Sequence, residues 1–197
     1  PPARYMALEA EVPQDGHPLD ETVLVDVGAY PGGYAWAFPK GDRVNVGVMV
    51  QYPGRRGLRA AFAAFVAQQP ALPAVAARSQ RVAPVAAPGS KPVPCCRPAV
   101  LLVGDAAHLA DPFLGEGIYY AVRSGRLAAS AVLQGAGGTE TAVRYANSIE
   151  AQVWPDLIAA SRVASLFHRM PRWWHHLLSL MPGSLSEVVG VLAGDQT

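Results

Sequence analysis

The sequence has little net charge, almost no cysteine and no long apolar run, and each absence excludes a class of protein. Sixteen Lys and Arg residues stand against fifteen Asp and Glu residues, so the formal net charge is +1 and no nucleic acid is expected as a partner. No apolar stretch reaches the roughly 18 residues that a transmembrane helix needs. With 51% hydrophobic residues among 197, we predict a cytoplasmic globular protein with one good core.

The two cysteines, Cys95 and Cys96, are adjacent in the sequence. Neighbouring cysteines cannot easily bridge each other across a trans peptide, and two thiols do not make a zinc site. We therefore expect two reduced thiols, with a redox role as the alternative. The adjacent pair His175 and His176 would point in different directions on a helix. No metal site is predicted.

Residues 101–125, LLVGDAAHLADPFLGEGIYYAVRSG, carry most of the functional information. The apolar run 100–103 ends in Gly104-Asp105, which predicts a carboxylate at the C-terminal tip of a buried strand. A loop follows, and a helix then begins after Gly117. Glycine-rich helix starts that follow strand tips are where open α/β folds hold ligands, because free N–H groups and the helix dipole attract anionic or electron-rich groups there. This pattern predicts a cofactor site.

A second informative segment reads as an antiparallel hairpin with arms at 33–38 and 43–50 and a turn at 39–42. Strand side chains alternate between the two faces of a sheet, so one face of the first arm is aromatic and the other carries small residues: Tyr34, Trp36 and Phe38 against Ala35 and Ala37. In the second arm, Val44, Val46 and Val48 lie opposite Asn45, Gly47 and Met49.

These two segments resemble FAD-dependent oxidoreductases of the para-hydroxybenzoate hydroxylase fold. Within that superfamily, GEGIYYAVRSG (115–125) is similar to the geranylgeranyl reductase family, whereas aromatic hydroxylases usually carry an Asn shortly after the second Gly. The pattern PxxYxWxFP (31–39), continued by KGDRVNVGV (40–48), fits the substrate domain of the same family. The two motifs occur in the family's order and together cover about a third of the chain.

The resemblance implies an α+β fold in three parts. We expect an antiparallel-sheet substrate domain in 1–92, the C-terminal strand and helix of a Rossmann-like FAD-binding domain in 93–135, and a helical C-terminal region in 136–197. The expected elements are strands at 3–12 and 22–28, a helix at 58–68, an extended proline-rich return at 79–98, a strand and helix within 99–133, and helices at 139–153, 155–169, 172–181 and 184–193.

The sequence contains no GxGxxG string, which such flavoproteins use to hold the FAD pyrophosphate. The nearest string, 115–120, ends in Tyr120, and the chain begins with Pro1. We therefore expect residues 1–197 to be the C-terminal part of a longer reductase. This chain alone would be incomplete and inactive and would retain FAD poorly, because the missing part would supply the site for the ADP half.

By resemblance, six residues are expected to contact the flavin: Gly104, Asp105, Pro112, Gly115, Gly117 and Ile118. Asp105 would accept hydrogen bonds from the ribityl hydroxyls. Gly115 and Gly117 would let backbone N–H groups approach the pyrimidine edge of the flavin, where negative charge develops on reduction. Pro112 and Leu114 would shape the loop. The alternatives are a helix cap or loop-stabilising role for Asp105 and simple turn chemistry for the glycines.

Other residues near this motif have more ordinary expected roles. Glu116 would serve the first turn of the helix, and His108 would be a loop histidine rather than a general acid. Ser124 and Gly125 would allow close packing of the helix on a sheet. The arginines of this helix, Arg123 and Arg126, would face solvent or a phosphate. No catalytic residue is assigned.

Tyr34, Trp36 and Phe38 are expected to form a wall of the substrate pocket, because an isolated alkene offers no charge and must be recognised by shape and apolar contact. An ordinary aromatic core stripe is the alternative. Asn45 and Gly47 would line the other face. The tract 169–178, RMPRWWHHLL, has the amphipathic, basic and aromatic character of an interfacial helix, although a capping helix pair on the domain is the favoured interpretation.

The leading hypothesis is an FAD-dependent reductase in which reduced flavin delivers hydride from N5 to a carbon–carbon double bond of a polyprenyl lipid or prenylated small molecule, and a proton completes saturation. The electron donor would be a nicotinamide or a ferredoxin. The protein itself would contact a membrane peripherally. Two alternatives remain: a flavin-dependent monooxygenase or halogenase of the same fold, and a truncated, non-catalytic remnant that binds a lipid or partner without FAD.

Overall fold

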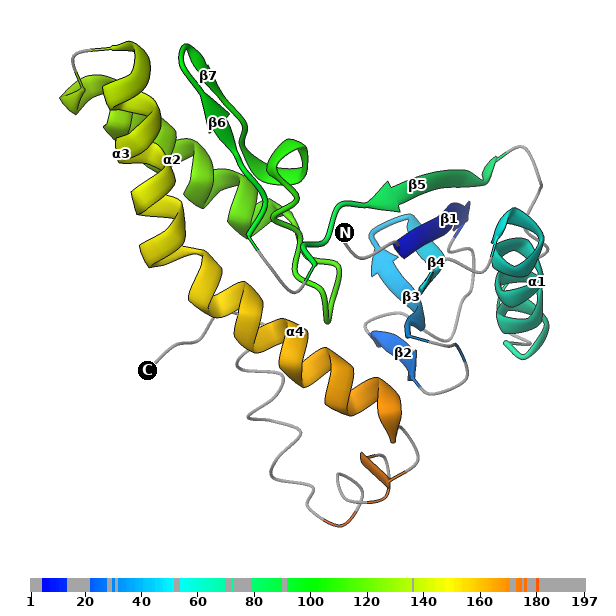
Figure 1. Cartoon of the computed structure of the whole chain (residues 1–197). Coiled ribbons are helices and arrows are strands. Elements are labelled where there is room, and N and C mark those ends of the chain that lie inside the picture. The colour runs from blue at the N-terminus through cyan, green and yellow to red at the C-terminus, as the bar shows by residue number, and fades with distance from the viewer. Residues whose placement is uncertain are drawn as a thin grey trace.

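The computed structural model describes residues 5–13, 22–27, 30, 32–51, 54–69, 72, 79–89, 92–135, 137–170, 173, 174, 176 and 180. An antiparallel sheet with one helix packed on it forms one part of the molecule, and three helices with a short two-stranded ribbon form the other (Figure 1). This mixture of helices and antiparallel sheet confirms the predicted α+β class. The division of the chain at residues 92 and 135 stays a prediction.

The sheet has five strands in the order β2-β3-β4-β1-β5, and every neighbouring pair is antiparallel. The strands are β1 (Tyr5–Pro13), β2 (Leu24–Val27), β3 (Tyr34–Lys40), β4 (Arg43–Gln51) and β5 (Arg81–Val85). The hairpin β3–β4 confirms the predicted one. Its turn is shorter than expected, because β3 continues through Lys40 and only Gly41, at φ +70°, and Asp42 remain between the strands. The proline-rich return contains β5, which completes the sheet beside β1.

The valine face of β4 packs under the helix α1 (Gly54–Ala67). Leu58, Phe62 and Phe65 recur at the spacing of one helical face, and all three are buried against the sheet. Ala35 and Ala37 belong to the same core, as the alternation of β3 predicted. Truncating a buried Phe of this kind costs about 3–5 kcal/mol. The helix α1 begins four residues earlier than expected.

The second part begins with the ribbon β6 (Cys96–Arg97) and β7 (Val100–Leu101), followed by the 3₁₀ turn η2 (Gly104–Ala107). Three helices follow: α2 (Ile118–Gln134), α3 (Gly138–Gln152) and α4 (Trp154–Arg169). Their core includes Tyr145, Ile149 and Leu157, and the Tyr145 hydroxyl donates a hydrogen bond to the Leu102 carbonyl at 2.6 Å. These helices confirm the predicted ones. The expected helix 172–181 lies mostly outside the described residues and 184–193 lies wholly outside them.

The expectation of a buried strand at 100–103 is wrong. β7 has two residues and pairs antiparallel with β6, and Val100 and Val103 are 52% and 38% exposed. A strand of a parallel sheet is buried because neighbouring strands and helices cover both its faces. Among the described residues β6 is the only strand that pairs with β7. No helix within the described ranges of the chain is long and apolar enough to cross a membrane.

Candidate functional site

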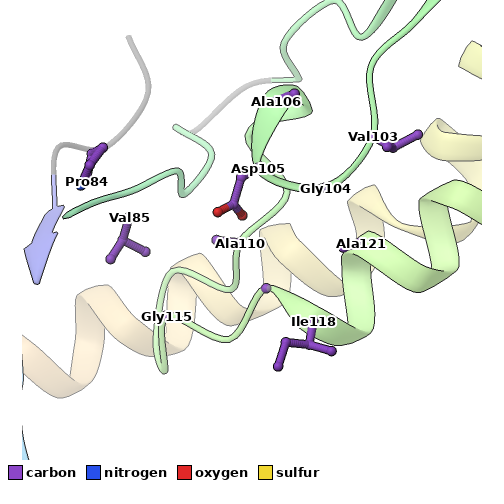
Figure 2. A pocket seen from close by; sticks show the side chains of 11 residues that line it. Pro84, Val85, Val103, Gly104, Asp105, Ala106, Ala110, Gly115, Ile118 and Ala121 are labelled. Atoms are coloured by element: carbon purple, nitrogen blue, oxygen red, sulfur yellow. The ribbon is translucent and has the colours of Figure 1, made fainter. Parts of the chain in front are cut away.

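A pocket of about 520 Å³ lies where β5, the turn η2 and the start of α2 meet (Figure 2). This volume is within the range of sites that hold small molecules and cofactors. Its lining is mostly apolar, with one titratable side chain, that of Asp105. The lining residues are Pro84, Val85, Val103, Gly104, Asp105, Ala106, Ala110, Gly115, Gly117, Ile118 and Ala121. Five of the six residues expected to contact a flavin are therefore brought together, and the sixth, Pro112, is buried in the adjoining loop.

Asp105 lies in the first turn of η2 with an exposed side chain. Figure 2 shows its carboxylate directed into the pocket, in the space between Val85 and the start of α2. Within the described part of the chain, no hydrogen bond or ion pair engages this carboxylate, and it caps neither η2 nor α2. The absence of a side chain at Gly117 keeps the space beside it open, since a Cβ there would lie 3.1 Å from the Asp105 Oδ1 atom. The carboxylate thus retains its capacity to accept hydrogen bonds from a ligand.

The turn that carries Asp105 is fastened to α2 through Gly104 and Ser124. Gly104 has φ +54°, and a Cβ there would lie 2.9 Å from the Ala121 Cβ. Its N–H donates to the buried Ser124 Oγ at 3.0 Å, and the Ser124 hydroxyl donates to the Tyr120 carbonyl at 2.6 Å. Ser124 is closely packed, but against the turn η2 rather than against a sheet as expected. The expectation of close packing is wrong for Gly125, where a Cβ would contact nothing within 4 Å.

The loop 111–116 is a closed turn built on Asp111. The Asp111 Oδ1 atom accepts hydrogen bonds from the N–H groups of Phe113 at 2.8 Å and Leu114 at 2.7 Å. The Asp111 carbonyl accepts from the Gly115 N–H at 2.9 Å, and the Asp111 N–H donates to the Glu116 carbonyl at 2.6 Å. The Gly115 N–H thus has an acceptor inside the loop, and the expected approach of backbone N–H groups to a flavin stays a prediction.

Gly115 is required for the shape of this loop. Its φ is +72°, a region that L side chains rarely adopt, and a Cβ there would lie 2.7 Å from the Met49 Sδ of β4. Both observations favour the turn-chemistry alternative for Gly115 and show that the loop approaches the sheet closely.

The start of α2 faces the pocket through Gly117 and Ile118. The Glu116 Oε1 atom accepts a hydrogen bond from the Tyr119 N–H at 2.7 Å, which confirms that Glu116 serves the first turn of the helix. The first bond of the helical ladder runs from the Ala121 N–H to the Gly117 carbonyl at 2.9 Å. The N–H groups before it lie at the positive end of the helix dipole, where electron-rich ligand atoms are stabilised.

Arg123 has a structural partner rather than the solvent or phosphate expected of it. Its Nη1 atom donates to the Tyr119 hydroxyl at 2.8 Å and to the Asp156 Oδ2 atom at 3.1 Å, so it joins α2 to α4. Arg126 is exposed, as expected. His108 has φ +55° and a buried Nδ1 atom without a partner in the described residues, but it does not line the pocket.

The aromatic face of β3 is covered rather than open. Trp36 is 8% exposed and forms a small second core with Tyr5, Met49 and Ala87. Its ring centroid lies 5.5 Å from that of Tyr34 and 6.0 Å from that of Phe38. None of the three aromatic side chains lines the pocket directly. Their expected role as a substrate wall stays a prediction.

Asn45 and Gly47 lie on the aromatic face, so the expectation that they line the other face is wrong. The Trp36 Nε1–H donates to the Asn45 Oδ1 atom at 2.6 Å. The Trp36 ring covers Gly47 so closely that a Cβ there would overlap it. In an antiparallel pair, residues directly opposite each other point to the same face, and Trp36 is opposite Gly47.

Tyr34 connects the sheet to the loop of the pocket. Its hydroxyl donates a hydrogen bond to the Leu114 carbonyl at 2.6 Å, across 80 positions of sequence. Burial, with a smaller contribution from the charge of Asp111, raises the pKa of Tyr34 to about 12. The hydroxyl therefore stays protonated and remains a donor. Sequence reasoning gave Tyr34 an apolar wall role and missed this bond.

A further contact that the sequence did not indicate joins the same loop to α4. The Phe113 ring packs edge-on against Phe167, with centroids 5.2 Å apart, and lies 6.2 Å from the ring of His168. Phe167 also stacks with Trp174 at 6.3 Å. The only signal in the sequence was the pair Phe167 and His168 at the end of the predicted helix 155–169. Such a pair does not indicate which residues it contacts.

The cysteines lie apart from the pocket. Both are free, as predicted, and the Cys96 thiol contacts the Ala142 carbonyl at 3.2 Å. Burial, with the neighbouring Cys96 as a smaller cause, raises the pKa of the Cys95 thiol to about 11. A thiol with a raised pKa is a poor nucleophile near neutral pH. Nowhere in the described ranges do three or more His, Cys, Asp or Glu side chains gather as a metal site would require.

Two solved structures share the fold of this chain over much of its length. A geranylgeranyl bacteriochlorophyll reductase-like protein from Thermoplasma acidophilum superposes with a TM-score of 0.72 at 24% identity, over 84% of this chain and 44% of that one. A flavin-dependent brominase superposes with a TM-score of 0.63 at 17% identity, over 98% of this chain and 50% of that one. At these identities the likeness shows the class of fold alone: the chain is folded like part of each of these two proteins.

Sequence relatives narrow this class, although no family model matches the chain. A digeranylgeranylglycerophospholipid reductase from Methanocella arvoryzae is 38% identical over 106 residues, 52% of this chain and 26% of the relative. Another, from Methanospirillum hungatei, is 39% identical over 106 residues, 50% of this chain and 25% of the relative. The chain thus spans about a quarter of the length of these relatives. They confirm the predicted similarity to geranylgeranyl reductases.

Proposed function

We propose that this chain forms part of an FAD-dependent reductase that saturates carbon–carbon double bonds of a polyprenyl lipid. One observation carries the proposal: the Asp105 carboxylate, without a partner in the described residues, is directed into a pocket at the positive end of α2. The names of the sequence relatives, reductases of a geranylgeranylated phospholipid, supply the substrate class.

The residues present fit one half of FAD. Asp105 would accept hydrogen bonds from the ribityl hydroxyls, and the absent side chain at Gly117 leaves room beside that carboxylate. The first turn of α2 would stabilise the negative charge that develops on the pyrimidine edge of the flavin upon reduction. The sequence offers no GxGxxG turn for the pyrophosphate. Reduced flavin, when bound, supplies a hydride from N5 to one carbon of the double bond.

The substrate side of the pocket is apolar. Val85 of β5 borders it and would contact a prenyl chain by shape and exclude water from the reacting carbon. Ile118 of α2, which is 81% exposed, borders it as well and would contact the flavin. Tyr34 would position the loop through its bond to Leu114. Trp36, which packs with Met49 in the same small core, would set the position of Met49. Asp105 is the one titratable group that lines the pocket, so the residue that delivers the completing proton is not assigned.

The proposal is tested by titrating the 197-residue chain with FAD and following flavin fluorescence. We expect measurable binding that is weaker than micromolar, because half of the cofactor has no site in this sequence. Asp105→Ala should weaken it about tenfold or more, since a hydrogen bond to a charged group contributes about 1.5–3 kcal/mol. Asp42→Ala, at the tip of the β3–β4 turn with a side chain that is 89% exposed, is the matched control. Unchanged affinity in Asp105→Ala, or equal loss in both variants, would contradict the flavin assignment.

A further inference from the structure

The C-terminal end of α4 presents an apolar stripe to solvent. Val163, Leu166 and Met170 are 52%, 48% and 46% exposed, and Trp173, three positions further on, is 54% exposed. Val163 and Leu166, three positions apart, lie on one side of the helix. Met170 is the C-cap residue, with φ −142° and ψ 57°, so Met170 and Trp173 follow the helix end in the chain rather than continuing its face. Leu180, still further along, is 66% exposed. Isolated exposed apolar residues are common, whereas several at one helix end favour a surface that meets an apolar partner.

Two arginines flank this stripe. Arg162 and Arg169 are exposed, and neither has an ion-pair partner within the part of the chain that the structure describes. The acidic side chain of the same helix, Asp156, is engaged by Arg123 near the opposite end. The end of α4 is therefore apolar and positively charged at once. That combination is complementary to a bilayer surface that contains anionic lipids, where apolar side chains enter the boundary region and arginines meet the headgroups.

The inner side of the same helix end packs on the loop of the pocket. Phe167 lies between Phe113 of the loop and Trp174, with ring centroids 5.2 and 6.3 Å from each. The loop continues to Gly115, which lines the pocket. Figure 1 shows α4 as a long helix that leaves the other helices and extends past the loop towards β2. One aromatic layer thus separates the exposed stripe from the loop that shapes the site.

We propose that this end of α4, with Trp173, docks on the surface of an anionic lipid bilayer and so holds the pocket loop close to the membrane. The inference deepens the proposed function, because a polyprenyl lipid resides in a membrane and would enter the pocket from that side. It rests on the proposed function only for the identity of the lipid that enters. Binding to vesicles requires no flavin, so failure of the membrane proposal and failure of the flavin proposal give different results.

The experiment is sedimentation of the 197-residue chain with vesicles of phosphatidylcholine and phosphatidylglycerol, compared with phosphatidylcholine alone. We expect the chain to bind the anionic vesicles more tightly. Leu166→Glu should lower the partition coefficient roughly tenfold, because it replaces an apolar side chain that would enter the bilayer boundary on binding. Arg162→Gln and Arg169→Gln should each lower it about fivefold on anionic vesicles only.

Leu133→Glu is the matched control, since Leu133 is 86% exposed at the far end of α2 and the change of side chain is identical. It should leave vesicle binding unchanged, and circular dichroism should show that both glutamate variants remain folded. The proposal is overturned if the chain does not bind anionic vesicles or if both variants lose binding equally. It is also overturned if Leu166→Glu dissociates a dimer in analytical ultracentrifugation while vesicle binding persists, because a second copy would then cover the stripe.

Discussion

Tyr34→Phe removes one hydroxyl and tests whether the sheet holds the pocket loop. The bond from Tyr34 to the Leu114 carbonyl is 2.6 Å long and part-buried, so its loss leaves a carbonyl without its partner. Such a loss costs about 1–2 kcal/mol of unfolding free energy. For a chain of this size, each kcal/mol corresponds to a change of roughly 2–4 °C in Tm. Urea unfolding should show the lower midpoint with an unchanged slope, because the folded surface is the same.

The pH dependence of the same variant gives an independent measurement. The pKa of Tyr34 is about 12 in the folded protein and about 10 in the unfolded chain. The Tyr34 hydroxyl therefore keeps its proton more tightly in the folded state than in the unfolded chain. Its contribution to the unfolding free energy is fully present below pH 10 and is lost as the pH rises from 10 towards 12. Tyr34→Phe should lack that component, and the gap between wild type and variant should narrow across this range.

The control for this variant is Tyr119→Phe. The Tyr119 side chain is 54% exposed and its hydroxyl accepts a bond from Arg123 on the surface, so its loss should cost no more than about 0.5 kcal/mol. Hydrogen exchange adds local detail, because the N–H groups of Phe113 and Gly115 should exchange faster in Tyr34→Phe while those of β4 do not. Equal stability of the two variants, or unchanged exchange in the loop, would refute the role of Tyr34 as the fastening of the loop.

Two further sets of substitutions probe the packing around the pocket. Trp36→Ala should lower the unfolding free energy by about 3–5 kcal/mol, because Trp36 is 8% exposed and bonded to Asn45. A near-native melt, with prenyl reduction lost when the substitution is made in the longer reductase, would instead support a wall of the substrate pocket. Gly115→Ala should destabilise the chain by at least 1 kcal/mol, because of its positive φ and the contact with Met49. Gly125→Ala, at a helical position with open space around it, should be neutral or stabilising by up to about 1 kcal/mol. A higher Tm for Gly115→Ala than for Gly125→Ala would contradict the geometry of the loop.

The parts of the fold that the sequence predicted are those that local patterns determine. The β3–β4 hairpin follows from alternation over two short segments with a glycine-containing turn. The start of α2 follows from Gly117, and Glu116 is correctly placed because a helix leaves the N–H groups of its first turn without partners. The clustering of Asp105 with the glycines is likewise local, since 13 positions separate Asp105 from Ile118 and one short loop joins them.

The features that the sequence did not predict depend on residues that are distant in the chain. The alternation of β3 shows that one face is aromatic, but it does not say that Tyr5 and Ala87 cover Trp36. The apolar run 100–103 has the composition of a buried strand, and its exposure depends on which neighbours the chain provides. Tyr34 and Leu114 are 80 positions apart, and no pattern in either segment indicates the bond. The acceptor of the Gly115 N–H was missed because a glycine indicates a permitted turn without indicating its partner.

The loop 111–116 is the point at which the sheet and the helices meet. Tyr34 bonds to it from β3, Met49 contacts it from β4, and Phe167 packs on it from α4. A ligand in the pocket would contact β5 on one side and α2 on the other, so it would bind only when these elements keep this arrangement. By mass action, such a ligand stabilises the arrangement as a whole. Flavin binding should therefore protect amides of the sheet as well as those of the loop, whereas a ligand held by α2 alone would leave the sheet unchanged.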